Sequence, residues 1–345
     1  MPQSGTPGHT TASSGCTRAV LPRNEVWPRV KLKNGLHLAY CTNIHRGESW
    51  QETFDSLRNY TLQVRAKVAP REPYAIGLRL SNQAARELSE PSTLLSFRKW
   101  LDENDCYVFT INGFPYGNFH GTRVKEQVYV PDWTTPERLD YTKVLFDLLA
   151  QLVPVGIEGS VSTVPGGFKP EITTTEQRRQ FRSNLWRCVE HIARLSESSG
   201  RKLHLGLEPE PMCLLETTEE VVQFFDELRQ DRTNDSLLSE YLGINYDTCH
   251  LAIQFEEPRR AIGLLRKHGI KLSKIHVSSA LTMRPTQEAR AALAGFADEI
   301  YLHQAVVRYP DGRLRRYLDI DQVLECERDK EISHENSPEI GRAHV

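Results

Sequence analysis

The chain has 345 residues, and its 43 Lys and Arg nearly balance its 45 Asp and Glu, which gives a formal net charge of −2. This balance argues against a nucleic-acid binder, because binding by phosphate neutralisation requires a strong basic excess. A hydrophobic content of 39% with 26% charged residues is typical of a globular protein. No segment reaches the roughly 18 uncharged apolar residues of a membrane helix, so we expect no transmembrane segment.

The seven cysteines are scattered and include no CxxC pair. This pattern argues against a zinc ribbon or a disulfide framework and predicts reduced thiols and a cytoplasmic location. Residues 1–24 are rich in Ser, Thr, Gly and Pro and lack the charged and apolar regions of a signal peptide. We interpret residues 1–29 as a disordered leader.

Short β-rich runs alternate with segments of helical period between residues 30 and 325. This alternation is typical of repeated βα units around a parallel sheet. No linker interrupts the series and no GxGxxG motif follows a strand, so one (β/α)8 TIM barrel is favoured over two domains or an open doubly wound sheet. The seven predicted strands are 36–45, 75–80, 106–113, 159–164, 203–210, 242–248 and 273–279.

Capping motifs mark the ends of several intervening helices. Ser49 with Glu52, and Thr217 with Glu220, form capping boxes. Gly200 is the expected C-cap of a long amphipathic helix. Two more helices are expected, one that opens at Pro136 behind Thr135 and one over 258–268.

The C-terminal part of the chain departs from the βα pattern. Asp311-Gly312 predicts a hairpin within 301–317, and a short helix is expected at 320–325. We expect 326–345 to be an unstructured and artefactual tail, because its last seven residues correspond to translation of a common sequencing-adapter read. The natural protein is then expected to continue, and the barrel to lack its last strand through C-terminal truncation.

Polar side chains follow the predicted strands at the ends that meet around one mouth of a barrel. Oxygen and nitrogen ligands in such a position suit Mg, Mn, Zn, Co or Fe. Taken singly, His276 is more typical of a hydrogen-bonded core histidine, and Glu208 is as consistent with a surface loop residue as with a ligand. The prediction of a metal site therefore depends on all of these residues together. They are His45, Asn112, Glu208, Glu210, Asp247, His250 and His276.

His120 lies in a long loop after the third strand. Gly113, Gly117 and Gly121 give this loop the freedom to approach a ligand, and aromatic side chains beside His120 are suited to covering a bound ring. The alternative is an ordinary packed loop.

The motif Tyr246-Asp247-Thr248-Cys249-His250, between LEPEP and KIHVSS on the flanking strands, resembles the xylose-isomerase-like TIM barrel superfamily. That superfamily includes sugar isomerases, 3-epimerases and endonuclease-IV-type phosphodiesterases. The resemblance implies that Glu208, Asp247 and His276 hold a divalent metal, with a last carboxylate supplied by the eighth strand. It also implies that His250 contacts substrate or binds a further metal.

Longer strings resemble one narrower family, the EboE-type metabolite traffic proteins. They are YCTNIH at 40–45, NGFPYGNFH at 112–120, VYVPDW at 128–133 and YLHQ at 301–304. This resemblance implies export or processing of a small precursor in secondary metabolism, and partners encoded in the same gene cluster.

Three functions fit these patterns. The first is a metal-dependent isomerase or epimerase, in which Glu208 is ligand and base and His250 and His120 are further catalytic candidates. The second is a non-catalytic metabolite-binding barrel, which a missing ligand on the eighth strand would favour. The third is an endonuclease-IV-like phosphodiesterase, for which His45, His120, His250 and His303 would be extra ligands of a multi-metal site. The near-zero net charge and the absence of a basic stripe disfavour DNA.

Overall fold

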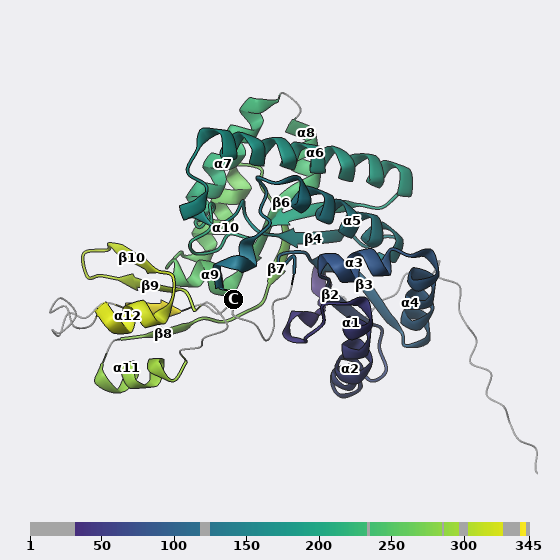
Figure 1. Ribbon diagram of the computed structural model, residues 1–345, viewed down its shortest axis with the longest axis horizontal. Coiled ribbons are helices and arrows are strands. Elements are labelled where there is room, and N and C mark those ends of the chain that lie inside the picture. The colour runs from purple at the N-terminus through teal and green to yellow at the C-terminus, as the bar shows by residue number, and fades with distance from the viewer. Residues whose placement is uncertain are drawn as a thin grey trace, which may run out of the picture.

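The computed structural model describes residues 32–117, 125–232, 235–284, 286–296, 303–326 and 339–342. Seven strands form one parallel sheet in the order of the sequence, flanked by helices (Figure 1). The first and last strands are not hydrogen-bonded to each other, so the sheet is a barrel left open on one side. This confirms the predicted α/β class with an incomplete TIM barrel. The strands are β1 (Tyr40–Cys41), β2 (Tyr74–Arg79), β3 (Cys106–Asn112), β4 (Gly159–Thr163), β5 (Leu203–Leu207), β6 (Leu242–Asp247) and β7 (Lys271–His276).

All seven predicted strands are present, but the first is much shorter than expected. A strand was predicted over 36–45, whereas only Tyr40 and Cys41 pair with β2. The preceding Leu36 and Leu38 are 62% and 49% exposed. An edge strand has one neighbour to pair with, so its apolar alternation alone does not extend it.

The helices confirm the predicted caps. Capping boxes are present at Ser49 and Thr217, and Gly200 ends its helix in the left-handed conformation with φ 65°. Thr135 occupies the expected N-cap position, but its hydroxyl donates to the Asp132 carbonyl. The α-helices are α1 (Trp50–Ser56), α2 (Leu62–Val68), α3 (Asn82–Leu88), α4 (Pro91–Glu103), α5 (Pro136–Leu152), α6 (Thr175–Ser199), α7 (Thr218–Asp231), α8 (Asp235–Tyr241), α9 (Thr248–Ile253), α10 (Pro258–Lys267), α11 (Gln287–Ala294) and α12 (Ile320–Cys326).

Five shorter turns of helix complete the first part of the chain. A π-helical turn connects α1 to α2. The short elements are η1 (Lys33–Gly35), η2 (Thr42–Ile44), η3 (Leu57–Thr61), η4 (Lys125–Tyr129) and η5 (Lys169–Glu171).

The main core lies between the sheet and its helices. Helix α5 packs against β3 and β4, and α6 packs against β5. An apolar stripe on α5 is buried, with Leu145, Leu148 and Leu149 each at most 1% exposed. Full burial of one such side chain contributes about 1.5–3 kcal/mol, so this stripe anchors α5 to the sheet.

A second, four-stranded sheet lies beside the barrel (Figure 1). It contains β8 (Leu281–Met283), β11 (Glu339–Arg342) and the predicted hairpin of β9 (Ala305–Arg308) and β10 (Leu314–Tyr317). Gly312 allows the hairpin turn with φ 86°.

Strand β11 falls in the tail that we predicted to be unstructured, and the prediction does not hold for these four residues. They pair with β8 and β9, and Ile340 is 2% exposed in the core of the second sheet. The exposed backbone N–H and C=O groups of β8 and β9 are available to pair with these residues, and the charged local sequence did not indicate this pairing. The predicted leader, 1–29, lies outside the described residues. Within the described part of the chain, no helix is long and apolar enough to cross a membrane.

The second sheet contacts the barrel beside α9. Val306 of β9 packs against Cys249 and Ile253 of α9. Arg316 of β10 forms an ion pair with the buried Glu216, with 2.6 Å between Arg316 Nε and Glu216 Oε2. These contacts place the second sheet next to the strand ends that carry the predicted metal ligands.

Candidate metal centre

Three adjacent parallel strands bring the predicted metal ligands together. Asp247 and His276 are register partners at the ends of β6 and β7. Glu208 directly follows β5, and its amide donates to the Thr163 carbonyl of β4. Because parallel strands end at one rim, residues far apart in the sequence become neighbours there.

The three side chains converge on one point. His276 Nδ1 lies 3.1 Å from Glu208 Oε1 and 3.3 Å from Asp247 Oδ2. One ligand atom from each residue lies within 4.8 Å of the others. Two ligands of one ion, each at 2.0–2.3 Å from it, lie about 3 Å apart, so the spacing and the donor types fit a divalent cation. This is a buried candidate metal site, with Glu208 5% and Asp247 6% exposed.

The outer oxygen of each carboxylate is held by the protein. Asn245 Nδ2 donates to Glu208 Oε2 at 2.7 Å. Asp247 Oδ1 accepts from the Cys249 amide at 2.9 Å and from Ser278 Oγ at 2.5 Å. Each carboxylate therefore keeps one oxygen turned towards His276, and such outer hydrogen bonds orient metal ligands.

The charges in the centre perturb one another. Burial and the nearby Lys274 lower the pKa of His276, but the carboxylates of Glu208 and Asp247 outweigh them and raise it. Burial raises the pKa of Asp247, but His250, His276 and Ser278 outweigh it and lower that pKa. Without an ion, a proton on His276 therefore supplies part of the positive charge between the carboxylates.

His250 lies beyond the end of β6, as its place three residues after Asp247 predicts. It belongs to the first turn of α9 and is 5% exposed. Asp247 is the N-cap of α9, and its Oδ1 accepts from the His250 amide at 3.4 Å, which starts the helix directly at the strand end. His250 Nδ1 lies 3.9 Å from Glu208 Oε1 and has no hydrogen-bond partner among the described residues.

Cys249 joins a second possible ligand group that sequence reasoning missed. Its sulfur and ligand atoms of Asp247 and His250 lie within 4.8 Å of one another, and all three residues are buried. Their closeness in sequence across the start of α9 was the available signal.

Among the described residues, His45 is not brought to the centre. His120 lies outside the described residues. His45 Nε2 lies 2.9 Å from Tyr40 Oη, and its ring stacks on Tyr60. Among the described residues, neither group of possible ligands includes His45 or His303. Of the four extra ligands of the phosphodiesterase hypothesis, His250 belongs to a group of possible ligands among the described residues, whereas His45 and His303 do not.

Glu210 lies in a buried hydrogen-bonded group next to the centre. Its Oε1 accepts from Tyr129 Oη at 2.9 Å and from Gln304 Nε2 at 2.7 Å. Burial raises the pKa of Glu210 to about 7, partly offset by His250. Tyr129 and Gln304 belong to the strings that carry the narrower resemblance, but nothing in those strings indicated this contact.

Lys274 was also missed. It lies two residues before His276 on β7, and its Nζ donates to Ser162 Oγ of β4 at 3.2 Å across the barrel. The two-residue period of a strand is the signal that places Asn245 with Asp247, and Lys274 with His276, on one face.

No family model matches the chain, and no curated protein sequence matches it. Several solved structures are similar. An IolI protein with a bound zinc atom shares 17% identity over 61% of this chain and 66% of its own, with a TM-score of 0.38. The probable 3-DHS dehydratase AsbF from Bacillus anthracis shares 15% identity over 85% and 90%, with a TM-score of 0.41. A xylose isomerase-like TIM barrel protein from Mycobacterium smegmatis, in complex with magnesium, shares 16% identity over 66% and 67%, with a TM-score of 0.42.

Proposed function

We propose that this protein is a metal-dependent enzyme of the isomerase or epimerase kind, acting on a small polyhydroxylated or carbonyl-bearing metabolite. The supporting observation is the convergence of one free carboxylate oxygen each from Glu208 and Asp247 on His276 Nδ1. These three residues would hold a divalent cation such as Mn, Mg, Zn or Co.

The residues around such a centre have different proposed roles. A bound divalent cation polarises a carbonyl or a pair of hydroxyls and stabilises negative charge on their oxygens. Glu208 is the candidate base, because Asn245 holds its Oε2 and leaves its Oε1 turned inwards. Asp247 is held through Oδ1 and stays ionised, so its role is to bind and not to move protons.

His250 is the candidate for contact with the substrate. Its Nδ1 lies 3.9 Å from Glu208 Oε1 and has no hydrogen-bond partner among the described residues. It is therefore placed to bind a substrate oxygen beside the base and to return a proton to it. His120 stays a proposed contact from the loop after β3.

The proposed substrate is a small precursor of secondary metabolism. The support is the resemblance of several strings to EboE-type metabolite traffic proteins. The same resemblance is the basis for proposing partners encoded in the same gene cluster. A metabolite-binding protein without catalysis is the second candidate, because the converging group contains three protein ligands among the described residues.

The test combines metal analysis with isotope exchange. Purified protein is stripped with a chelator and reloaded with Mn, Mg, Zn or Co, and bound metal is measured for the wild type and for Asp247→Ala. Ketoses and related carbonyl metabolites are then incubated in D2O, and NMR records deuterium at the carbon beside the carbonyl. We expect one metal per chain, lost in D247A, and metal-dependent exchange. Metal binding without exchange across the panel supports the binding protein, and absence of metal binding overturns the proposal.

A further inference from the structure

Glu210 lies where three parts of the chain meet. It belongs to the loop that follows β5, and its side chain is fully buried. Its Oε1 accepts from Tyr129 Oη in the loop after β3, at 2.9 Å, and from Gln304 Nε2, next to β9 of the second sheet, at 2.7 Å. Its Oε2 has no hydrogen-bond partner among the described residues. The orientation of this carboxylate therefore depends on Tyr129 and Gln304.

The side-chain amide of Gln304 has one orientation that suits its neighbours. Its Nε2 also donates to the Pro211 carbonyl at 3.1 Å and to Tyr129 Oη at 2.9 Å. Turning the amide over would bring its oxygen against the Glu210 carboxylate and the Pro211 carbonyl, which are both acceptors. Gln304 is fully buried, so water is not an easy substitute for these contacts. The second sheet is thus hydrogen-bonded to Glu210 and to the residue that follows it.

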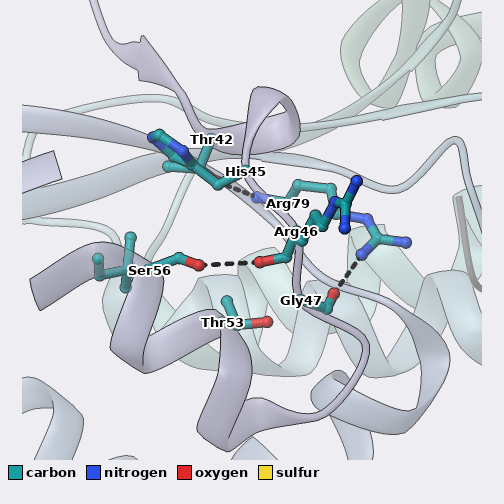
Figure 2. Close-up of a pocket in the computed structure, with 8 residues that line it drawn as sticks. Thr42, His45, Arg46, Gly47, Thr53, Ser56 and Arg79 are labelled. Carbon is teal, nitrogen blue, oxygen red and sulfur yellow. Dashed lines mark hydrogen bonds between the residues drawn. The ribbon is translucent and has the colours of Figure 1, made fainter. Parts of the chain in front are cut away.

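Tyr129 is also held on several sides. It is fully buried, and its ring stacks on that of Phe168 with the centroids 5.5 Å apart. The start of the loop that contains Tyr129 is held by Arg79 at the end of β2. Arg79 Nη2 donates to the Gly117 carbonyl at 2.7 Å, and its Nη1 donates to the Gly47 carbonyl in the loop after β1 at 2.5 Å (Figure 2). Both donors to Glu210 therefore come from well-packed positions.

A stiff stretch of backbone connects Glu210 to Glu208. Both glutamates precede a proline, in the sequence Glu208-Pro209-Glu210-Pro211. Proline fixes its own φ and restricts the residue before it to extended conformations. In an extended chain, side chains two residues apart lie on the same face. A change in the position of Glu210 is therefore passed on to Glu208.

We propose that Glu210 is a positioning residue for Glu208, and that Tyr129 and Gln304 set the geometry of the metal centre through it. The role of Glu208 as a metal ligand comes from the proposed function, on which this role of Glu210 rests. Glu210 acts through the two hydrogen bonds that its Oε1 accepts and not through its charge. The second sheet, which is joined to Gln304, is then part of the scaffold of the centre.

Two replacements at position 210 separate hydrogen bonding from charge. Glu210→Gln keeps an oxygen that accepts from Tyr129 and Gln304, whereas Glu210→Leu loses both hydrogen bonds. Chelator-stripped full-length protein is titrated with Mn²⁺ in competition with a fluorescent chelator, and circular dichroism checks that each variant is folded. We expect E210L to bind Mn²⁺ about tenfold more weakly than the wild type, and E210Q to stay within about threefold of it.

Gln304→Leu tests the contribution of the second sheet. We expect Q304L to weaken Mn²⁺ binding about as much as E210L, and the double variant E210L/Q304L to be no weaker than E210L, because Gln304 acts through Glu210. Q304L alone provides the comparison if E210L does not fold. Additive losses of affinity from E210L and Q304L would reduce Gln304 to an independent structural contact and overturn the proposal.

Arg316→Leu is the matched control. Arg316 also joins the second sheet to the loop after β5, through Glu216, and Glu216 keeps its ion pair with Lys169 in this variant. We expect R316L to lower the stability and to leave the Mn²⁺ affinity unchanged. An equal loss of affinity in R316L and Q304L would show that any contact with the second sheet has this effect, which contradicts a specific role of Glu210.

Crystal structures of the metal-free variants give a readout that does not depend on metal binding. The 3.1 Å distance between Glu208 Oε1 and His276 Nδ1 should be kept in E210Q and lost in E210L and Q304L. If the wild type binds no Mn²⁺ but the distance changes in this way, the proposed function fails and the positioning role of Glu210 stands. If the distance is unchanged in folded E210L or Q304L, the positioning role is wrong, whether or not the protein binds Mn²⁺.

Discussion

Asn245 Nδ2 donates a 2.7 Å hydrogen bond to Glu208 Oε2, and Glu208 Oε1 in turn faces His276 Nδ1 at 3.1 Å. Asn245 thus decides which oxygen of Glu208 is free for the centre. Both residues are buried, so neither has water as an easy substitute partner. The position of one amide on β6 therefore sets the orientation of a ligand on β5.

We expect Asn245→Leu to lower metal affinity by about 10- to 100-fold without abolishing binding, because an outer partner of a ligand is lost and the ligand remains. Competition with a fluorescent chelator measures the affinity. Circular dichroism provides the check that the variant is folded. An unchanged affinity in a folded N245L would remove the orienting role of Asn245.

His250→Ala and Asp247→Ala separate substrate contact from metal binding. Asp247 Oδ2 faces the centre, whereas His250 Nδ1 lies 3.9 Å from Glu208 Oε1. We expect H250A to keep most of its metal and to lose ligand affinity or turnover, and D247A to release the metal. Mass spectrometry of metal content gives the comparison, and equal loss in both variants would make His250 a primary ligand.

Metal affinity should rise with pH. The folded-state pKa of His276 is raised, so its proton stabilises the metal-free protein below the unfolded pKa of about 6.5, and this contribution is lost as pH rises through the folded pKa. A metal ion must displace that proton, so binding strengthens over the same range. Urea unfolding of the metal-free protein from pH 6 upwards measures the slope of the unfolding free energy against pH. Metal titration over the same range measures the slope of metal affinity against pH.

The pKa of His250 is also raised, so the pH dependence of the wild type alone does not identify which histidine titrates. The His276→Asn variant isolates the contribution of His276. We expect both slopes to be reduced in H276N. Identical pH dependence of unfolding in wild type and H276N would show that His276 does not carry the proton.

Two glycine substitutions should have opposite effects on stability. A Cβ at Gly243 on β6 would lie 2.3 Å from the Lys271 carbonyl of β7, whereas a Cβ at Gly263 on α10 meets nothing within 4 Å. We expect Gly243→Ala to destabilise the fold by about 1–3 kcal/mol and to weaken metal binding, because β6 and β7 must shift apart. Gly263→Ala should stabilise it by about 0.5–1 kcal/mol.

Chemical denaturation of the two variants measures this difference. If G243A is as stable as the wild type, the close approach of β6 to β7 is not required for the fold.

The sequence by itself determined the features that depend on near neighbours in the chain. Apolar alternation identified all seven strands of the sheet, and the capping boxes at Ser49 and Thr217 located two helix starts. The predicted strand bounds placed Glu208, Asp247 and His276 at strand ends. These signals are local because backbone geometry repeats over two to four residues.

The tertiary structure decided what depends on register between strands. It selected Asn245 as the partner of Glu208, brought Lys274 to Ser162 across the barrel, and limited β1 to two residues because β1 has one neighbour. It also turned Asp247 into the N-cap of α9, which buried His250. No local pattern records these pairings, because each depends on how strands distant in the sequence are aligned with one another.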